Sequence, residues 1–207
     1  MFLLYIFLLF NWSSAAEFTP VIQTTKGPMK GLVLTTIRES KKYHSYRGIP
    51  YGKPPIGHLR FRIPKDGKDT NLKAVMFWIF GGAFVVGAPS KFYYSPDYLI
   101  EEDIVVVTVN YRLGALGFLA LQHQNATGNA GLKDQNLGLR WVRDNIAKFG
   151  GDPNKVTIVG ESSGSVSVDL HLLSEKSKGL YRSSIAMSGV SLCYWGFSIP
   201  KDATERA

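Results

Sequence analysis

The first part of the chain carries short hydrophobic stretches separated by turns. Residues 17–64 include strand-like stretches at 21–25 and 32–36, on either side of the turn-forming Lys26-Gly27-Pro28. Hydrophobic and polar positions alternate only imperfectly in them, which predicts short strands paired as antiparallel hairpins.

From residue 74 the hydrophobic stretches become continuous. Residues 74–80 and 104–109 are apolar throughout and lack alternation, another buried strand is predicted at 156–159, and a last strand is predicted at 184–188. Continuous apolar runs of this length are typical of strands that are buried on both faces of a parallel sheet. They predict the central strands of the fold.

Helical periodicity lies between these strands. Residues 134–148 place their apolar side chains on one stripe at helical spacing: Leu137, Leu139, Trp141, Val142 and Ile146. Gly150-Gly151-Asp152-Pro153 predicts the end of that helix, because glycine and then proline commonly follow a helix terminus. A second helix is predicted at 163–173. Strands that alternate with helices predict an α/β fold.

Composition narrows the class of protein. The 207 residues are 45% hydrophobic and 19% charged, which excludes disordered, collagen-like and coiled-coil chains. The net charge is +8, and residues 26–73 hold twelve lysine or arginine residues against three acidic ones. Neither a recognition helix nor a metal-finger spacing accompanies them, so nucleic-acid binding is not expected. We interpret the basic segment as a solvated face or as one that lacks its acidic partners, with a heparin or membrane-surface site as a weaker alternative.

The N-terminus has the form of a secretory signal peptide. Residues 1–10 are all apolar, too few for a membrane span, which needs about 20. Ser14-Ala15-Ala16 provides a small-residue cleavage site. We therefore expect a signal peptide at 1–16, a secreted chain from Glu17 and no membrane span. The single cysteine, Cys193, is interpreted either as a free buried thiol or as half of a bridge to a partner elsewhere.

Two glycine-containing turns carry the candidate chemistry. Gly160-Glu161-Ser162-Ser163-Gly164 matches G-x-S-x-G and lies between a predicted strand and a predicted helix, as a nucleophile elbow does. Its glycines, Gly160 and Gly164, permit the sharp turn that lifts Ser162 above the sheet, and the following helix directs free N–H groups at it. Gly81-Gly82-Ala83 follows the strand that ends at Phe80, where the backbone can approach and donate to an oxyanion.

These turns belong to a longer series of segments, in a fixed order along the chain: Tyr46-Arg47-Gly48-Ile49-Pro50-Tyr51, Leu59-Arg60-Phe61, Trp78-Ile79-Phe80-Gly81-Gly82-Ala83-Phe84, Val109-Asn110-Tyr111-Arg112-Leu113, Gly128-Asn129-Ala130-Gly131-Leu132-Lys133-Asp134-Gln135, Phe149-Gly150-Gly151-Asp152-Pro153 and the elbow itself. With them the sequence resembles the type-B carboxylesterases of animals, the family that also contains the cholinesterases. The resemblance runs from about residue 20 to Trp195 and implies an α/β-hydrolase fold, N-terminal strands followed by a central parallel sheet with the nucleophile elbow.

The resemblance also implies roles for individual residues. Ser162 matches the family's nucleophile, and three residues match those whose backbone N–H groups form its oxyanion hole: Gly82, Ala83 and Ser163. Arg112 and Asp134 match a structural ion pair. The implied reaction is hydrolysis of a small-molecule carboxylic ester through an acyl-serine, with no metal and no organic cofactor. Asn125-Ala126-Thr127 is a glycosylation sequon, which suits a loop of a secreted protein.

The sequence departs from the family in two places. In α/β-hydrolases the acid and the histidine of the triad follow the serine in the chain, but the family's acid and histidine segments are not among the 45 residues after Ser162. The chain is also shorter near residues 62–73, where the family has another strand and an acidic partner for Arg47. We therefore expect 17–207 to be a partial domain, truncated at its C-terminus.

No histidine of this sequence is expected to replace the missing base. His171 lies nine residues after Ser162, about 13.5 Å along the predicted helix and on its opposite side, so packing or helix surface is its expected role. His44, His58 and His123 precede the serine and are expected to be exposed. A non-catalytic, cholinesterase-like binding or adhesion protein, or an inactive fragment, is therefore the alternative to an esterase.

Overall fold

The computed structural model describes residues 16–51, 72–124 and 126–205. Several sequence predictions fall outside these residues: the apolar run of the signal peptide with Ser14 and Ala15 of its cleavage site, His58, the segment Leu59-Arg60-Phe61, nearly all of the shortened stretch near 62–73, and Asn125.

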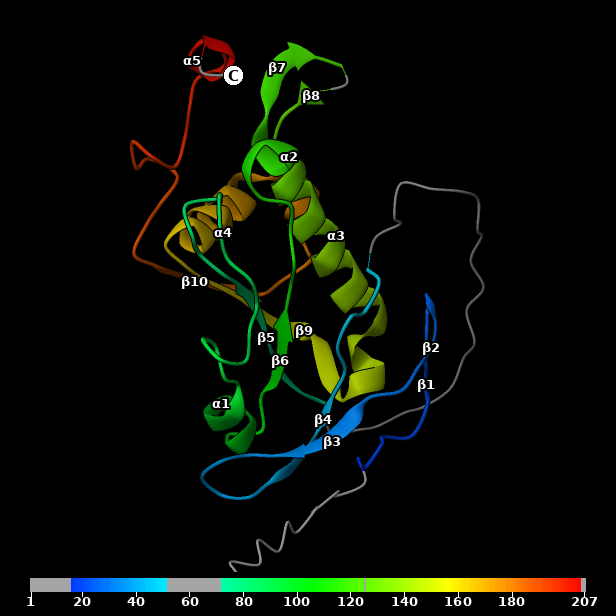
Figure 1. Cartoon of the computed structure of the whole chain (residues 1–207). Coiled ribbons are helices and arrows are strands. Elements are labelled where there is room, and N and C mark those ends of the chain that lie inside the picture. Colours follow the sequence, from blue (N-terminus) through cyan, green and yellow to red (C-terminus); the bar gives the residue numbers. More distant parts are fainter. Residues whose placement is uncertain (1–15, 52–71, 125, 206–207) are drawn as a thin grey trace, which may run out of the picture.

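The described residues form ten strands and seven helices (Figure 1). The strands are β1 (Ile22–Thr24), β2 (Gly27–Met29), β3 (Leu32–Thr35), β4 (Lys42–Ser45), β5 (Lys73–Ile79), β6 (Val105–Thr108), β7 (Ala120–His123), β8 (Ala126–Thr127), β9 (Gly151–Glu161) and β10 (Ser183–Met187). The helices are α1 (Asp97–Glu101), α2 (Gly114–Phe118), α3 (Ala130–Asn145), α4 (Ser163–Leu173), α5 (Pro200–Glu205) and the 3₁₀ helices η1 (Ile146–Phe149) and η2 (Glu175–Ser177).

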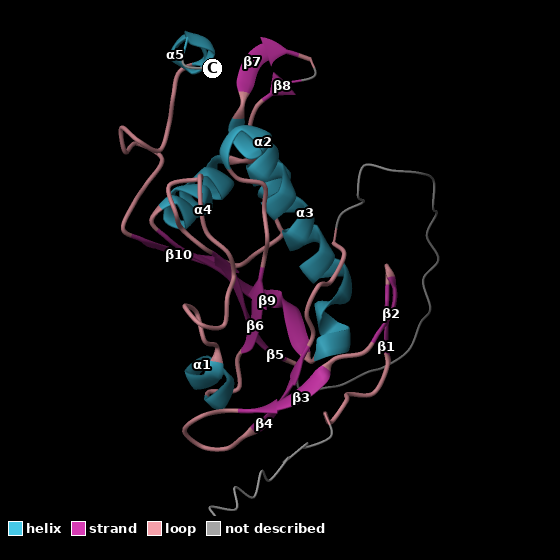
Figure 2. Cartoon of the chain, in the orientation of Figure 1, coloured by secondary structure: helices cyan, strands magenta, loops and turns pink. Residues whose placement is uncertain are grey.

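A four-stranded parallel sheet in the order β10-β9-β5-β6 forms the centre of the molecule (Figure 2). Val75 of β5 pairs with Val105 of β6 on one side and with Val156 of β9 on the other. The predicted parallel sheet is thus confirmed, with a strand at each of the four predicted positions, although β10 is mostly exposed.

The two faces of β5 differ in burial, which corrects the prediction that both faces are fully covered. Val75, Phe77 and Ile79 are at most 1% exposed and form the core, whereas Met76 and Trp78 on the other face are half-buried. Tyr94 contacts Trp78 there, with ring centroids 5.2 Å apart. Helix packing therefore seals one side of the sheet, and loops partly cover the other.

Helix α3 confirms the predicted amphipathic stripe except at one position. Leu139, Val142 and Ile146 are at most 2% exposed and Trp141 is 6% exposed, but Leu137 is 45% exposed and points away from the core. The helix continues as η1, and Gly150 ends it in the left-handed conformation at φ 81°, as the glycine after the helix predicts.

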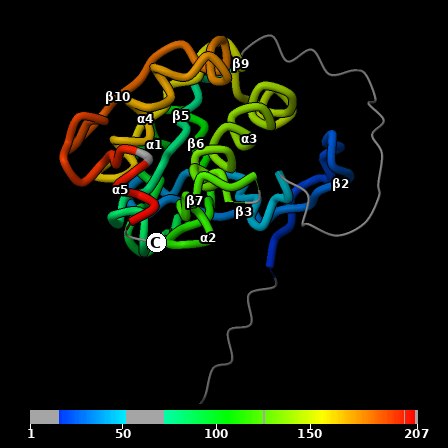
Figure 3. Tube along the Cα trace, turned by 90° about the horizontal axis from the view of Figure 1, so that it is seen from above, coloured from blue at the N-terminus to red at the C-terminus, as the bar shows by residue number. Residues whose placement is uncertain are grey.

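The N-terminal strands form two separate antiparallel hairpins. β1 pairs with β2, so the predicted turn at Lys26-Gly27-Pro28 is largely strand, and β3 pairs with β4. The β1–β2 hairpin lies beside the C-terminal end of α3, where the Thr25 amide donates to Asn145 Oδ1 at 2.8 Å (Figure 3). At the opposite end of the molecule, α5 contacts the β7–β8 hairpin through Gln122 and Thr204.

In the described part of the chain, no helix is long and apolar enough to span a membrane.

Candidate active site

Ser162 occupies the turn between β9 and α4, in a backbone conformation that few residues adopt. Its φ is 56° and its ψ is −122°. A Cβ at Gly160 would overlap the backbone of Gly164, and a Cβ at Gly164 would overlap the carbonyl of Ile79. Both glycines of the motif are therefore required sterically, and the strain at Ser162 is maintained by the surrounding sheet.

The serine lies at the carboxyl ends of three neighbouring strands. Its amide donates to the Met187 carbonyl at the end of β10 (2.9 Å). A Cβ placed on Gly81, just after β5, would stand 3.0 Å from Ser162 Cβ. In open parallel sheets this edge is where ligands bind.

The loop after β5 is wound tightly through left-handed conformations. Gly82, Ala83 and Phe84 have φ values of 120°, 54° and 62°. The amides of Val85 and Val86 both donate to Gly82 O at 3.0 Å, which closes the turn. Among the described residues, the Gly82 and Ala83 amides donate to no protein acceptor, so their N–H groups stay available to a ligand.

Ser163 connects this loop to the elbow. The side chain is fully buried, and its Oγ accepts a hydrogen bond from the Phe84 amide at 3.3 Å. Nearby, the Tyr111 hydroxyl donates to the Phe80 carbonyl at 2.7 Å. Burial raises the pKa of Tyr111 to about 12, against a smaller opposing effect of the Ser163 hydroxyl. Tyr111 is thus a neutral donor at neutral pH.

The three predicted oxyanion-hole residues are therefore neighbours in space. Gly81 and Phe84, which flank Gly82 and Ala83, both contact the 162–163 elbow. The Ser163 amide is in the first turn of α4, whose N-terminal N–H groups have no partner within the helix and carry partial positive charge. The arrangement can place donors on an oxygen that acquires negative charge beside Ser162.

His171 is fully occupied by other contacts. It is 4% exposed, with Nδ1 2.8 Å from Ser177 Oγ and Nε2 3.0 Å from Gln135 Oε1. Burial lowers its pKa to about 4, so the ring is neutral at neutral pH. Of its two expected roles, packing is the one that the structure supports.

The other described histidines lie away from the serine. His44 is exposed on β4, and His123 is exposed on β7. Lys41, just before β4, binds Asp103, just before β6, which places this hairpin at the start of the sheet strands rather than at their carboxyl ends. Within the described residues, none of the three histidines is placed to take a proton from Ser162.

Arg112 and Asp134 form a bidentate ion pair between the end of the sheet and α3. Arg112 Nε and Nη2 donate to the two carboxylate oxygens at 2.7 and 2.8 Å, and the Arg112 amide adds a third bond at 3.0 Å. The pKa of Arg112 is raised, chiefly by the hydrogen bond to Asp134. The pair joins the end of the sheet to α3.

Two contacts at the site were not predicted from the sequence. Tyr111 follows β6 at the carboxyl edge of the sheet, and that position was the available signal. Glu161 directs its Oε2 to 2.8 Å from where a Cβ on Gly81 would stand. No cluster of three or more metal-ligating side chains occurs in the described part of the chain. Cys193 has no disulfide partner there.

A parallel sheet that presents a strained serine between strand and helix at its carboxyl edge defines an α/β-hydrolase. The chain belongs to the carboxylesterase family, whose family model matches it at residues 18–70 and 63–207.

Individual relatives agree with this assignment. Esterase B1 of Culex pipiens is 37% identical over 229 residues, covering 89% of this chain and 42% of the relative. Juvenile hormone esterase of Tribolium castaneum is 37% identical over 85% of this chain and 37% of its own length. The crystal structure of juvenile hormone esterase from Manduca sexta, with OTFP covalently attached, superposes with a TM-score of 0.73 at 31% identity, covering 83% of this chain and 41% of that one. The chain thus spans about two fifths of the length of these relatives.

Proposed function

We propose that this chain carries the nucleophile and the oxyanion-binding half of a serine hydrolase that cleaves small-molecule carboxylic esters. The observation that carries the proposal is the strained Ser162, next to the unpaired amides of Gly82 and Ala83 at the edge of the sheet. The covalent adduct in the Manduca sexta relative supports covalent chemistry on this scaffold.

The reaction would proceed through an acyl-serine. Ser162 Oγ bonds to the ester carbonyl carbon and gives up its proton to a base, while the carbonyl oxygen takes the negative charge and accepts hydrogen bonds from the loop and helix amides. Collapse of this intermediate breaks the bond to the alkoxide, which leaves with a proton. Water then hydrolyses the acyl-serine to the free acid. No metal or cofactor takes part in these steps.

Among the described residues, no general base lies beside Ser162 to accept its proton. We infer that the chain by itself attacks slowly, at a rate set by the elbow and the oxyanion-binding amides. We also propose that the sequence omits a stretch near 62–73, which the family's match in two segments supports.

A fluorophosphonate probe tests the proposal. The full chain is incubated with the probe, and adducts are followed by intact mass and peptide mapping. We expect a single adduct at Ser162, formed faster at pH 9 than at pH 7 because hydroxide substitutes for the base. Ser162→Ala should abolish it, whereas Ser188→Ala, at an exposed serine on the same edge, should leave it unchanged.

Two outcomes would contradict part of this account. Adducts spread evenly over exposed serines would show that Ser162 has no special reactivity, and would favour the binding or adhesion alternative. An adduct at Ser162 that forms within seconds at pH 7 would show that a base is present.

We further propose that the protein is secreted and glycosylated. The apolar run at 1–10, the small residues at 14–16 and the sequon at Asn125 support this, and Thr127 of the sequon is exposed on β8. Expression in animal cells should yield a medium form beginning near Glu17, whose mass falls on treatment with N-glycosidase and does not fall for Asn125→Gln.

A further inference from the structure

After β10 the chain passes α4 on its way to α5 (Figure 1). Two successive turns shape this part: the Cys193 amide donates to the Val190 carbonyl at 3.0 Å, and the Gly196 amide donates to the Cys193 carbonyl at 2.8 Å. A Cβ on Gly196 would stand 3.1 Å from Val166 Cγ1 of α4. The chain from 189 to 196 is thus folded against the helix that follows Ser162, and we call it the 189–196 segment.

The 189–196 segment begins beside the candidate nucleophile. A Cβ on Gly189 would stand 3.1 Å from the Ser162 carbonyl oxygen and 3.0 Å from Trp195 Cη2, so both residues lie next to this glycine. The strand order is β10-β9-β5, and Ser162 follows the middle strand of these three. Because the oxyanion-binding loop follows β5 and the segment follows β10, the two lie on opposite sides of Ser162.

Two side chains of α4 hold this segment. Ser165 Oγ donates to the Gly189 carbonyl, and Asp169 Oδ2 accepts a hydrogen bond from the Ser191 amide at 2.7 Å. Residues four apart in an α-helix lie one turn apart on the same face. One face of α4 therefore provides both bonds.

Both bonds are largely shielded from solvent. Ser165 is fully buried, and Ser191 is 9% exposed. The pKa of Asp169 is lowered, first by the Ser191 hydroxyl and then by the Ser191 amide, so the carboxylate is charged at neutral pH. A hydrogen bond to a charged acceptor is roughly twice as strong as one between neutral groups. We therefore expect the loss of either bond to loosen the segment.

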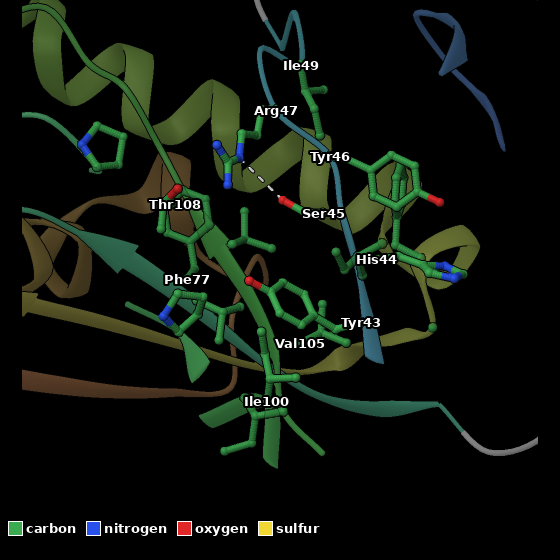
Figure 4. Close-up of a pocket in the computed structure, with 18 of the residues that line it drawn as sticks. Tyr43, His44, Ser45, Tyr46, Arg47, Ile49, Phe77, Ile100, Val105 and Thr108 are labelled. Atoms are coloured by element: carbon green, nitrogen blue, oxygen red, sulfur yellow. Dashed lines mark hydrogen bonds between the residues drawn. The ribbon is translucent and has the colours of Figure 1, made fainter. Parts of the chain in front are cut away.

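The large cavity between β4 and β6 lies apart from these contacts (Figure 4). Its volume is about 1070 Å³, and Tyr43, Val105 and Thr108 are among the residues that line it. Neither Ser162 nor any residue of the 189–196 segment lines it. An ester that reacts at Ser162 therefore lies outside this cavity.

We propose that Ser165 and Asp169 are positioning residues for the reaction at Ser162, an inference that rests on the esterase function proposed above. Their hydrogen bonds hold the 189–196 segment as a fixed wall of the site, opposite the oxyanion-binding amides. The ester carbonyl lies between this wall and those amides, so the wall limits the bulk of the group next to the carbonyl. Because reaction rates depend steeply on how the reacting atoms are placed, a loose wall changes which substrates react.

Hydrogen exchange of the full chain, followed by NMR at the Ser191 amide, tests the structural part of the proposal. Asp169→Ala removes the acceptor of this amide and should speed its exchange at least about tenfold. Asp169→Asn keeps an oxygen acceptor and should restore most of the protection. Glu175→Ala is the control, because it removes a carboxylate whose side chain is 87% exposed and pairs with Lys178, away from the segment. It should leave the exchange unchanged.

A competition between two fluorophosphonate probes tests the functional part. One probe has a linear linker at phosphorus and the other a branched one, and both are added together in excess. The ratio of the two Ser162 adducts, read from intact mass, does not depend on how much protein is folded, because both probes react with the same molecules. Ser165→Ala and Asp169→Ala should each shift this ratio toward the branched probe by at least about threefold. Asp169→Asn and Glu175→Ala should keep the ratio of the unmodified chain.

Three results would overturn the proposal. An adduct ratio that neither alanine variant changes would show that the segment does not limit the reacting group. Unchanged exchange of the Ser191 amide in Asp169→Ala would show that the carboxylate does not hold the segment. Equal behaviour of Asp169→Asn and Asp169→Ala in both measurements would assign the effect to charge instead of to the hydrogen bond. Absence of any Ser162 adduct in the unmodified chain would instead refute the esterase function itself, and this inference with it.

Discussion

The hydroxyl of Ser163 connects the two parts of the candidate site, the loop after β5 and the elbow between β9 and α4. It accepts from the Phe84 amide in the loop after β5, and the backbone of the same residue begins α4. Ala83 and Phe84 both have left-handed conformations, which cost about 1 kcal/mol or more each outside glycine. The bond from Ser163 helps to maintain this loop in place.

Ser163→Ala should therefore misplace the loop amides without unfolding the protein. We expect the free energy of unfolding to fall by about 1 kcal/mol, and the rate of fluorophosphonate attack at Ser162 to fall severalfold. Denaturant titration and intact-mass kinetics measure the two quantities. Ser167→Ala is the control, because that buried hydroxyl contacts the Ser163 carbonyl and Gln135 but not the loop. If Ser163→Ala reacts as fast as the unmodified chain, the hydroxyl has no positioning role.

For individual residues, the sequence predicts those roles that depend on neighbours in the sequence. The elbow was predictable because Gly160 and Gly164 stand two residues from the serine and its turn requires them. The bond between Phe84 and Ser163 joins positions 79 residues apart, and no local pattern encodes it. The exclusion of His171 as a base followed from helical spacing, but its contacts with Gln135 and Ser177 did not.

Helix α3 is attached to several other parts of the molecule along its length. Its first turns are joined to the sheet by the ion pair of Asp134 with Arg112, its middle packs on Phe77 and Val109 at Gly138, and its end accepts the β1–β2 hairpin at Asn145. The Asp134 side chain is only 13% exposed, so its three hydrogen bonds are largely shielded from solvent.

Asp134→Asn should lower the free energy of unfolding by about 2–3 kcal/mol, because it removes the charge that Arg112 neutralises and one of its acceptors. Thermal and urea unfolding measure the loss. Asp144→Asn is the matched control on the same helix: it breaks the pair with Arg143, whose side chains are 47% and 46% exposed, and should cost less than about 1 kcal/mol. Equal losses for the two variants would show that Asp134 is no more than a surface partner.

Helices and strands were predictable where burial imposes a recognisable pattern of hydrophobic residues on the sequence. Four apolar runs gave the four parallel strands, and the stripe on α3 gave the longest helix. The helices α1, α2 and α5 are six residues or shorter, and the strands β7 and β8 have four and two residues, so none of them presents a regular pattern that the sequence would reveal. Leu137 was misplaced because apolar character alone does not distinguish the edge of a stripe from its centre.

Across the whole molecule, a chain of buried polar groups runs from the candidate site to η2. It passes from Ser163 through Ser167 and Gln135 to His171 and Ser177, with spacings between 2.8 and 3.2 Å. All five side chains are at most 4% exposed. Of these five residues, only His171 titrates near neutrality in the unfolded protein. It therefore links the stability of the whole domain to pH.

The free energy of unfolding should decrease as the pH falls from 6.5 to 4. His171 has a pKa of about 4 in the folded protein against 6.5 as an ordinary value, so the unfolded chain binds the proton first over that window. Its contribution is fully present above pH 6.5 and declines by up to about 3 kcal/mol by pH 4. Urea titrations at several pH values measure this, and His171→Gln should flatten the profile whereas His44→Gln, at an exposed position, should not. A profile unchanged by His171→Gln would assign the acid sensitivity to other groups.

The order of strands in the sheet also has a consequence for synthesis on the ribosome. β5 emerges first among the four parallel strands and meets β6 soon afterwards, but its other neighbour, β9, follows only after α3 has been made. Until then the hydrophobic residues Val75, Phe77 and Ile79 lie beside an unpaired backbone edge, a combination that promotes association with other chains. The strand at the centre of the finished sheet thus spends much of its synthesis as an edge.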